Sequence, residues 1–339
     1  MDLLGKINGT RSVDPSIEDT SEVEGNTELP RVLMLGGFGR SGSTLLERCL
    51  AQCEGFTGMG EVLHLWERGL RDNELCGCNQ PFDQCPYWRS IGNLAYGGWD
   101  KVHTEETISD RRTVVRNRFL PELMGQFAIG SRRAARTRLL EQLNKLYSAA
   151  SLQSGSDILV DSSKHPAYSY LLRSARIDLR CVLVVRDARG VAFSWSKVVK
   201  RPETGERNEE MPRYSIFESM VNWTSYSLLF HALAIFRIPV LTVHYEQFMA
   251  EPTETIRRIA QFAGHTASAP LLPELKDKSV TLSAHHTVAG NPMRFKVGRV
   301  NLNLDEAWKI KMKRWDRIVA TGLSAPLRAA YYLGSLFRR

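Results

Sequence analysis

Four short apolar runs are spread along the chain, and stretches with helical periodicity separate them. The runs cover residues 32–35, 157–161, 179–185 and 239–245. Runs of this length, bounded by turn residues, are typical of strands buried on both faces of a parallel sheet. After each run, apolar residues recur every three or four positions, as they do on one face of a helix. This alternation predicts an α/β fold with a doubly wound parallel sheet flanked by helices.

The 339 residues are enough for one large domain. Residues 1–29 are rich in Ser, Thr, Glu, Asp and Gly, which predicts a flexible tail. We expect the folded domain to span residues 30–325 and residues 326–339 to form a basic tail. Inside the domain, residues 64–150 hold a cysteine-rich loop followed by a basic, helical pattern, which predicts an inserted helical or loop cap.

A glycine-rich turn, Gly36-Gly-Phe-Gly-Arg-Ser-Gly-Ser-Thr44, follows the first apolar run. Glycine lets backbone N–H groups approach a ligand closely, and the helix after the turn directs the positive end of its dipole toward it. Such a turn binds phosphate. The spacing nearly matches the G-x-x-x-x-G-K-[ST] loop of ATP- and GTP-binding proteins, but the lysine is missing and Arg40 supplies an earlier cation. The alternative is a glycine-rich turn that binds nothing.

Polar residues also follow the other apolar runs. They lie within Asp161–Lys164, Arg186–Ser194 and Tyr245–Gln247. Because ligands of open α/β sheets bind at the carboxyl ends of the strands, we expect these groups to meet the glycine-rich turn in one crevice.

The segment Gly39-Arg40-Ser41-Gly42-Ser43-Thr44-Leu45 resembles the 5′-phosphosulfate-binding loop of sulfotransferases that use 3′-phosphoadenosine 5′-phosphosulfate (PAPS). Its Arg-Ser-Gly-[Ser/Thr]-Thr form is more similar to the tyrosylprotein and bacterial branches than to the cytosolic aryl branch. A second block, in which Ser194 follows Arg186 by eight residues, resembles the family's site for the 3′-phosphate. The resemblance covers scattered blocks across residues 31–310 and implies a sulfotransferase with PAPS as donor.

The resemblance also implies catalytic residues. Glu61 lies 21 residues after Arg40 and follows a glycine, as the catalytic glutamate of the tyrosylprotein branch does. A carboxylate there can take the proton of an acceptor hydroxyl, and His64 is the rival base. Lys164 resembles a cation that reaches the transferring group in relatives, and Arg40 is the second catalytic cation.

A late segment, Gly290-Asn-Pro-Met-Arg-Phe295, resembles the Gly-Asn-Pro-x-Arg loop of bacterial members. By analogy with the lid over the 3′-phosphate and adenine, Asn291 and Arg294 would contact the cofactor. The cofactor-binding set implied by the resemblance is therefore Gly39, Arg40, Ser41, Gly42, Ser43, Thr44, Arg186, Ser194, Asn291 and Arg294.

The function hypothesis is transfer of a sulfuryl group from PAPS to a hydroxyl of a carbohydrate, a lipid or another small molecule, with no metal in the reaction. The alternative is a kinase-like nucleotide phosphotransferase, in which Asp161 at the end of an apolar run would help to hold Mg²⁺. The missing loop lysine argues against that alternative. A third possibility is a nucleotide-binding protein without catalysis.

Three cysteines, Cys76, Cys78 and Cys85, lie close together in the sequence. Three thiolates and a fourth ligand can hold zinc, but no second pair of ligands follows nearby. We therefore favour a small packed loop of reduced or regulatory thiols, with zinc as the alternative. The sequence does not decide between them.

The net charge of +8 is compatible with an anionic ligand and also with solubility alone. No nucleic-acid-binding module is recognised, so a nucleic-acid partner is not expected. The sequence shows no secretory signal and no apolar run of transmembrane length. We therefore expect a cytoplasmic location and a bacterial-type enzyme, because Golgi relatives usually carry an N-terminal anchor. The acceptor and the oligomeric state cannot be read from the sequence.

Overall fold

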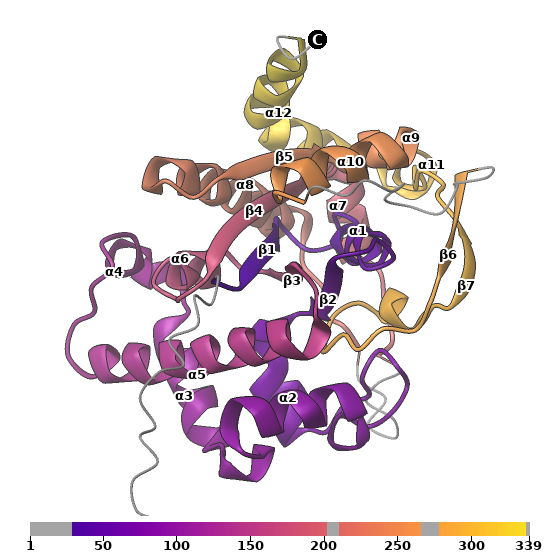
Figure 1. Cartoon of the computed structure of the whole chain (residues 1–339). Helices are drawn as coiled ribbons and strands as arrows, with labels where there is room; N and C mark the ends of the chain where they lie inside the picture. The colour runs from indigo at the N-terminus through magenta and orange to yellow at the C-terminus, as the bar shows by residue number, and fades with distance from the viewer. Residues whose placement is uncertain (1–28, 202–209, 266–277, 337–339) are drawn as a thin grey trace, which may run out of the picture.

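Five parallel strands form the central sheet of the computed structural model, in the order β2-β3-β1-β4-β5 (Figure 1). The strands are β1 (Arg31–Gly36), β2 (Phe56–Gly60), β3 (Ile158–Lys164), β4 (Asp178–Val185) and β5 (Val240–His244). The structure describes residues 29–201, 210–265 and 278–336, so residues 1–28 of the expected tail lie outside it. The sheet confirms the predicted α/β class.

Successive residues of β1 face two separate hydrophobic cores, as side chains of a strand must. Val32 and Met34 belong to one core, while Leu33 and Leu35 belong to the other. Helices α5 (Ser131–Ser154), α6 (Pro166–Leu172), α7 (Ala188–Trp195) and α8 (Ile216–Ala232) contribute to the first core, and α1 (Ser43–Leu50), α9 (Tyr245–Ala250) and α10 (Pro252–Phe262) to the second. Burial on both faces explains why β1 reads as an uninterrupted apolar run.

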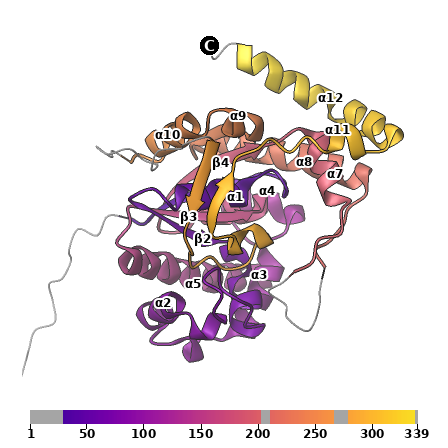
Figure 2. The ribbon, with the colours of Figure 1, turned by 90° about the vertical axis from the view of Figure 1, so that its right-hand side faces the viewer.

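The structure contains three strands that the sequence did not predict. β2 ends at Gly60, and β6 (Ser279–Leu282) pairs antiparallel with β7 (Gly298–Asn301). These strands have only four or five residues each, so they carry little periodicity, and strand formation depends strongly on pairing with neighbouring strands. The β6–β7 pair lies beside α1 (Figure 2).

The segment expected to form a cap is helical and lies between β2 and β3. It contains the π-helix η2 (Leu65–Arg71), α2 (Pro86–Tyr96), α3 (Thr104–Val114), α4 (Leu120–Met124) and α5. Helices α2 and α3 both pack on α5, below the sheet in Figure 1. The buried side chains of Trp88 and Leu143 join this layer to the main core.

The chain ends with α11 (Trp308–Lys311) and α12 (Arg314–Leu336), which packs on α7 and α8. Residue 325, where we expected the domain to end, lies inside α12. Among the described residues, no helix is both long enough and apolar enough to cross a membrane.

Candidate active site

The glycine-rich turn after β1 ends in Gly42, the N-cap residue of α1. Gly42 has a φ of 89°, and a Cβ added there would lie 2.5 Å from a ring atom of Tyr245. Only glycine adopts this positive φ freely and leaves room for the Tyr245 ring. No side chain caps α1 and its first turn carries no acidic residue. The backbone N–H groups of this turn are therefore available to an anion, which the helix dipole also favours.

Internal contacts hold the rest of the turn in shape. The Ser41 hydroxyl donates to the carbonyl of Phe38 at 2.7 Å, and the Trp195 indole N–H donates to the carbonyl of Gly39 at 2.9 Å. Trp195 also stacks on Phe38, with ring centroids 5.2 Å apart. Ser41 thus supports the turn from within and does not face the cavity that the turn borders.

A cavity of about 540 Å³ lies at the carboxyl ends of the strands. The groups predicted to meet there do meet, because segments from β1, β3, β4 and β5 all line it. Ten residues of the sequence-based set form part of its wall: Gly39, Arg40, Gly42, Ser43, Thr44, Glu61, Lys164, Arg186, Ser194 and Asn291. Ser41 and Arg294 do not.

Arg40 is placed over the face of Trp195, with its guanidinium carbon 5.0 Å from the ring centroid. Its Nε and Nη2 atoms are buried, and neither has a hydrogen-bond partner in the described part of the chain. Burial lowers the pKa of Arg40, while the charge of Glu61 acts in the opposite direction. Arg40 and Lys164 both have positive φ, 72° and 64°. For residues other than glycine this conformation is costly, and residues that adopt it cluster at functional sites.

Glu61 and Lys164 also line the cavity and form an ion pair, with Lys164 Nζ and Glu61 Oε1 2.5 Å apart. Burial is the largest single influence on the pKa of Glu61 and would raise it. The charge and hydrogen bond of Lys164, together with the charges of His64 and Arg68, outweigh burial and hold that pKa below its usual value. The Nε2 atom of His64 lies 3.8 Å from the other carboxylate oxygen. Burial lowers the pKa of His64 to about 4, so its ring is neutral at pH 7. Both rival bases are thus able to accept a proton.

Arg186 directly follows β4 and contacts three residues: Arg40, Asp305 and Tyr245. It donates to the carbonyl of Arg40 at 3.2 Å, and its Nη2 donates to the carboxylate and backbone carbonyl of Asp305 at 3.0 and 2.8 Å. Its guanidinium lies 4.6 Å from the ring centroid of Tyr245. The ion pair with Asp305 means that any phosphate at Arg186 would compete with a carboxylate already there.

Asn291 and Arg294, from the late loop, have different surroundings. Asn291 caps the short helix η9 (Pro292–Phe295), accepting from the N–H of Met293 at 3.0 Å, and it lines the cavity. Arg294 is almost fully buried and donates to the carbonyls of Thr287 and Leu75 at 2.8 and 2.7 Å. Arg294 therefore ties the late loop to the cysteine-rich loop.

Asp161, the magnesium ligand of the kinase-like alternative, is fully buried away from the cavity. Its carboxylate accepts from the hydroxyl of Tyr147 at 2.6 Å and from the N–H of Ser163 at 2.9 Å. Burial raises its pKa to about 6. The carboxylate is used within the core, so it does not support metal binding at the cavity.

Sequence reasoning missed two residues that shape the site: Trp195 supports Arg40, and Asp305 pairs with Arg186. Tyr245, which the sequence placed at the crevice without a role, packs on Gly42 and Arg186. Trp195 directly follows Ser194 and Tyr245 ends a predicted strand, so their positions gave a signal. Asp305 gave none, because only the return of the chain after β7 brings it to the cavity.

Comparisons with known proteins point to one family. A model of the sulfotransferase family matches residues 32–268. The sulfotransferase domain from the Synechococcus PCC 7002 olefin synthase is 18% identical, with a TM-score of 0.45 over 89% of this chain and 97% of that domain. The sulfotransferase domain from the curacin biosynthetic pathway is 15% identical, with a TM-score of 0.46 over 88% and 99%. A search of curated proteins found no match. Because the family model covers well over half of the chain, the protein belongs to the sulfotransferase family.

Proposed function

We propose that this sulfotransferase moves the sulfuryl group of PAPS to a hydroxyl of a small-molecule acceptor. The observation that carries the proposal is the convergence of three cations, Arg40, Lys164 and Arg186, with the uncapped N-terminus of α1 around one cavity. Such a donor set matches a ligand with two separate anionic groups.

The residues present fit PAPS by three observations. The cavity volume lies in the usual range for ligand sites of about 300–1,000 Å³. Two nitrogens of Arg40 are buried without a partner among the described residues, which an anion would correct. A Cβ on Gly39 or Gly42 would lie within 2.8 Å of Trp195 or Tyr245, so glycine lets the turn pack on these two rings while no side chain caps the start of α1.

The proposed roles follow from these positions. The backbone of Gly39 to Thr44, with the hydroxyls of Ser43 and Thr44, would hold the 5′-phosphate. Arg186 and Ser194 would hold the 3′-phosphate, and Asn291 would form the wall beside it. Ser41 would act by shaping the turn and Arg294 by fixing the late loop, since neither lines the cavity.

When bound, PAPS supplies a sulfuryl group attached to a phosphate leaving group. Glu61 takes the proton of the acceptor hydroxyl, whose oxygen bonds to sulfur as the bridging sulfur–oxygen bond breaks. Arg40 and Lys164 stabilise the negative charge that the broken bond leaves on the phosphate. Before the reaction, Lys164 is paired with Glu61. Proton transfer to Glu61 neutralises that carboxylate and weakens the pair, so the charge of Lys164 becomes available to the leaving phosphate.

The test uses the full-length protein with PAPS and a panel of hydroxyl acceptors: sugars, lipids, phenolic natural products and tyrosine peptides. Mass spectrometry should find a sulfated product, and adenosine 3′,5′-bisphosphate should raise the melting temperature. Absence of both results would refute the proposal. Phosphoryl transfer from Mg²⁺–ATP in place of sulfation would favour the kinase-like alternative.

A further inference from the structure

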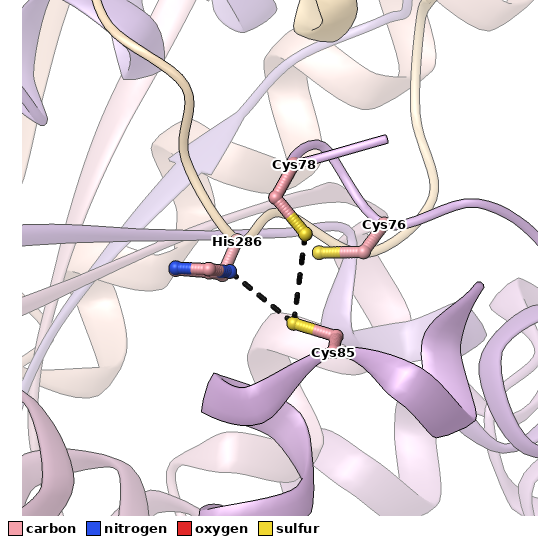
Figure 3. Close-up of side chains that lie close together, drawn as sticks. All are labelled: Cys76, Cys78, Cys85 and His286. Atoms are coloured by element: carbon pink, nitrogen blue, oxygen red, sulfur yellow. Dashed lines mark hydrogen bonds between the residues drawn. The ribbon is translucent and has the colours of Figure 1, made fainter. Parts of the chain in front are cut away.

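The cysteine-rich loop meets a histidine from the far end of the chain. Cys76, Cys78, Cys85 and His286 bring three sulfur atoms and one ring nitrogen within 4.8 Å of one another. Figure 3 shows that the four side chains point toward a common centre, from three separate stretches of chain. His286 is the fourth ligand that the sequence around the cysteines lacked, and it lies 201 residues after Cys85.

Two distances within this cluster are close to those of a tetrahedral site. Zinc–sulfur bonds of about 2.3 Å place two sulfur ligands about 3.8 Å apart, and sulfur and nitrogen ligands about 3.6 Å apart. The Sγ atoms of Cys78 and Cys85 are 3.8 Å apart, and Cys85 Sγ lies 3.2 Å from His286 Nδ1. A disulfide needs sulfur atoms about 2.0 Å apart. All six cysteines of the chain are free.

The backbone is arranged to bring these ligands together. The turn that carries Cys76 is closed by hydrogen bonds from Cys76 N–H to the carbonyl of Gln80 and from Asn79 N–H to the carbonyl of Cys76, both 2.8 Å. Gly77 donates its N–H to the carbonyl of Thr287 at 2.9 Å. A Cβ on Gly77 would lie 2.5 Å from the carbonyl of His285, so only glycine lets the two segments approach this closely.

Each remaining ligand is also oriented by its neighbours. Cys85 is the N-cap residue of α2, where the helix dipole favours a thiolate. The His286 ring stacks on Tyr87, with centroids 5.1 Å apart and an interplanar angle of 13°, which directs Nδ1 at the sulfur atoms. Cys76 and Cys85 are buried, while Cys78 and His286 are half-buried. Fixed orientation of the ligands by surrounding groups is typical of metal sites.

We propose that Cys76, Cys78, Cys85 and His286 bind one structural Zn²⁺ ion. Four protein ligands complete the tetrahedron and leave no open position for catalysis. On binding, the three thiols lose their protons to solvent and the imidazole binds as the neutral ring. The site does not depend on the proposed sulfuryl transfer.

The ion would hold the segment after His286 against the end of β2, the strand that leads to Glu61. Two residues after His286, Val288 forms two hydrogen bonds with β2: its N–H donates to Met59 at 2.9 Å and its carbonyl accepts from the N–H of Glu61 at 2.8 Å. The same loop then reaches Asn291 on the cavity wall. Zinc would therefore hold together the end of β2 and the segment after His286, which contribute Glu61 and Asn291 to the cavity wall.

The experiment measures metal in the untagged, full-length protein, isolated under reducing conditions without chelator, by inductively coupled plasma mass spectrometry. We expect about one zinc per chain, and a lower melting temperature after removal of the metal by a strong chelator. His286→Ala should lose the zinc, whereas His285→Ala is the matched control and should keep it. Cys78→Ser should lose it as well, with Cys53→Ser as its control.

A conservative replacement separates metal binding from simple packing. His286→Cys restores a zinc ligand but cannot stack on Tyr87, so retention of zinc and of the melting temperature would support the site. Cobalt(II) in place of zinc should give the strong visible bands of tetrahedral thiolate coordination, which His286→Ala should weaken. Folded, reduced wild-type protein that holds no zinc and takes up none on addition of Zn²⁺ would overturn the proposal. A disulfide among the three cysteines in the freshly isolated protein would also overturn it.

Discussion

The two walls of the cavity are built in different ways. The wall that we propose to bind phosphate is largely one continuous piece, Gly39–Thr44, with its shape determined by glycines and by the start of α1. The other wall brings Glu61 from the end of β2 together with the late loop and Asp305, which lie more than 200 residues further along the chain. The proposed phosphate site therefore lies within one short segment, whereas the wall with the proposed base exists only once distant segments have packed.

Gly60 shows how tightly the second wall is assembled. It has a φ of 83°, and a Cβ there would lie 2.1 Å from the carbonyl of Val288. Only glycine therefore lets the late loop pair with the end of β2. The Gly60-Glu61 pair recognised in the sequence thus has a physical basis: the glycine admits the loop whose carbonyl binds the N–H of Glu61.

We expect the largest loss of activity from a change of Glu61, on the wall that distant segments form. Glu61→Gln removes the proton acceptor and keeps the size of the side chain, so kcat for sulfation should fall about 10²–10⁴-fold. Binding of adenosine 3′,5′-bisphosphate, followed by isothermal calorimetry, should change little. His64→Gln is the matched control with a smaller expected loss. If the histidine variant loses the activity and the glutamate variant keeps it, His64 is the base.

Two replacements of Arg40 test the role of the continuous wall, Gly39–Thr44. Both Arg40→Ala and Arg40→Gly should reduce kcat about 10²–10³-fold, because the buried cation lines the cavity in which we place the reacting groups. Their stabilities should differ, since glycine adopts a φ of 72° freely and alanine does not. Urea unfolding should therefore find the glycine variant more stable by about 1 kcal/mol. Equal stability would mean that the positive φ stores no strain, and full activity in either variant would remove Arg40 from catalysis.

The sequence predicted the strand, the glycine-rich turn and the helix that form the continuous wall, because these residues are neighbours along the chain. It also placed the strand ends correctly, since parallel strands align their carboxyl ends. It missed β2, in which two of the five residues are glycine. It could not show that the Arg294 guanidinium is directed at backbone carbonyls, because that depends on a cysteine-rich loop more than 200 residues earlier.

The pH dependence of sulfation tests how Glu61 and Lys164 depend on each other. In the wild type the pKa of Glu61 is held below its usual value and that of His64 is about 4, so activity should stay level down to about pH 5. Lys164→Met removes the main charge that lowers the pKa of Glu61, while burial, which raises it, stays. The acid limb of the kcat/KM profile should therefore shift to higher pH by about 1–3 pH units. The maximum kcat/KM should also fall, because Lys164 is a proposed catalytic cation.

A control variant tests whether that shift is specific to the loss of Lys164. Lys309→Met removes an exposed lysine that pairs with Glu306 far along the chain, and it should leave the acid limb in place. An acid limb that does not move in Lys164→Met would contradict Glu61 as the titrating base. A wild-type limb near pH 6.5 would instead indicate a histidine with an ordinary pKa.

The smallest expected effect concerns the contact where the two walls meet, at Arg186 and Asp305. Asp305 is half-exposed, and its carboxylate occupies the guanidinium that we assign to the 3′-phosphate. Asp305→Asn should remove this competition and tighten binding of adenosine 3′,5′-bisphosphate a few-fold, in line with the ~1 kcal/mol of a partly exposed ion pair. Glu306→Gln is the matched control, because it removes the same charge one residue away without touching Arg186. Equal tightening in both variants would indicate a general charge effect. Weaker binding in Asp305→Asn would mean that the carboxylate positions Arg186, and that the two walls cooperate in holding the nucleotide.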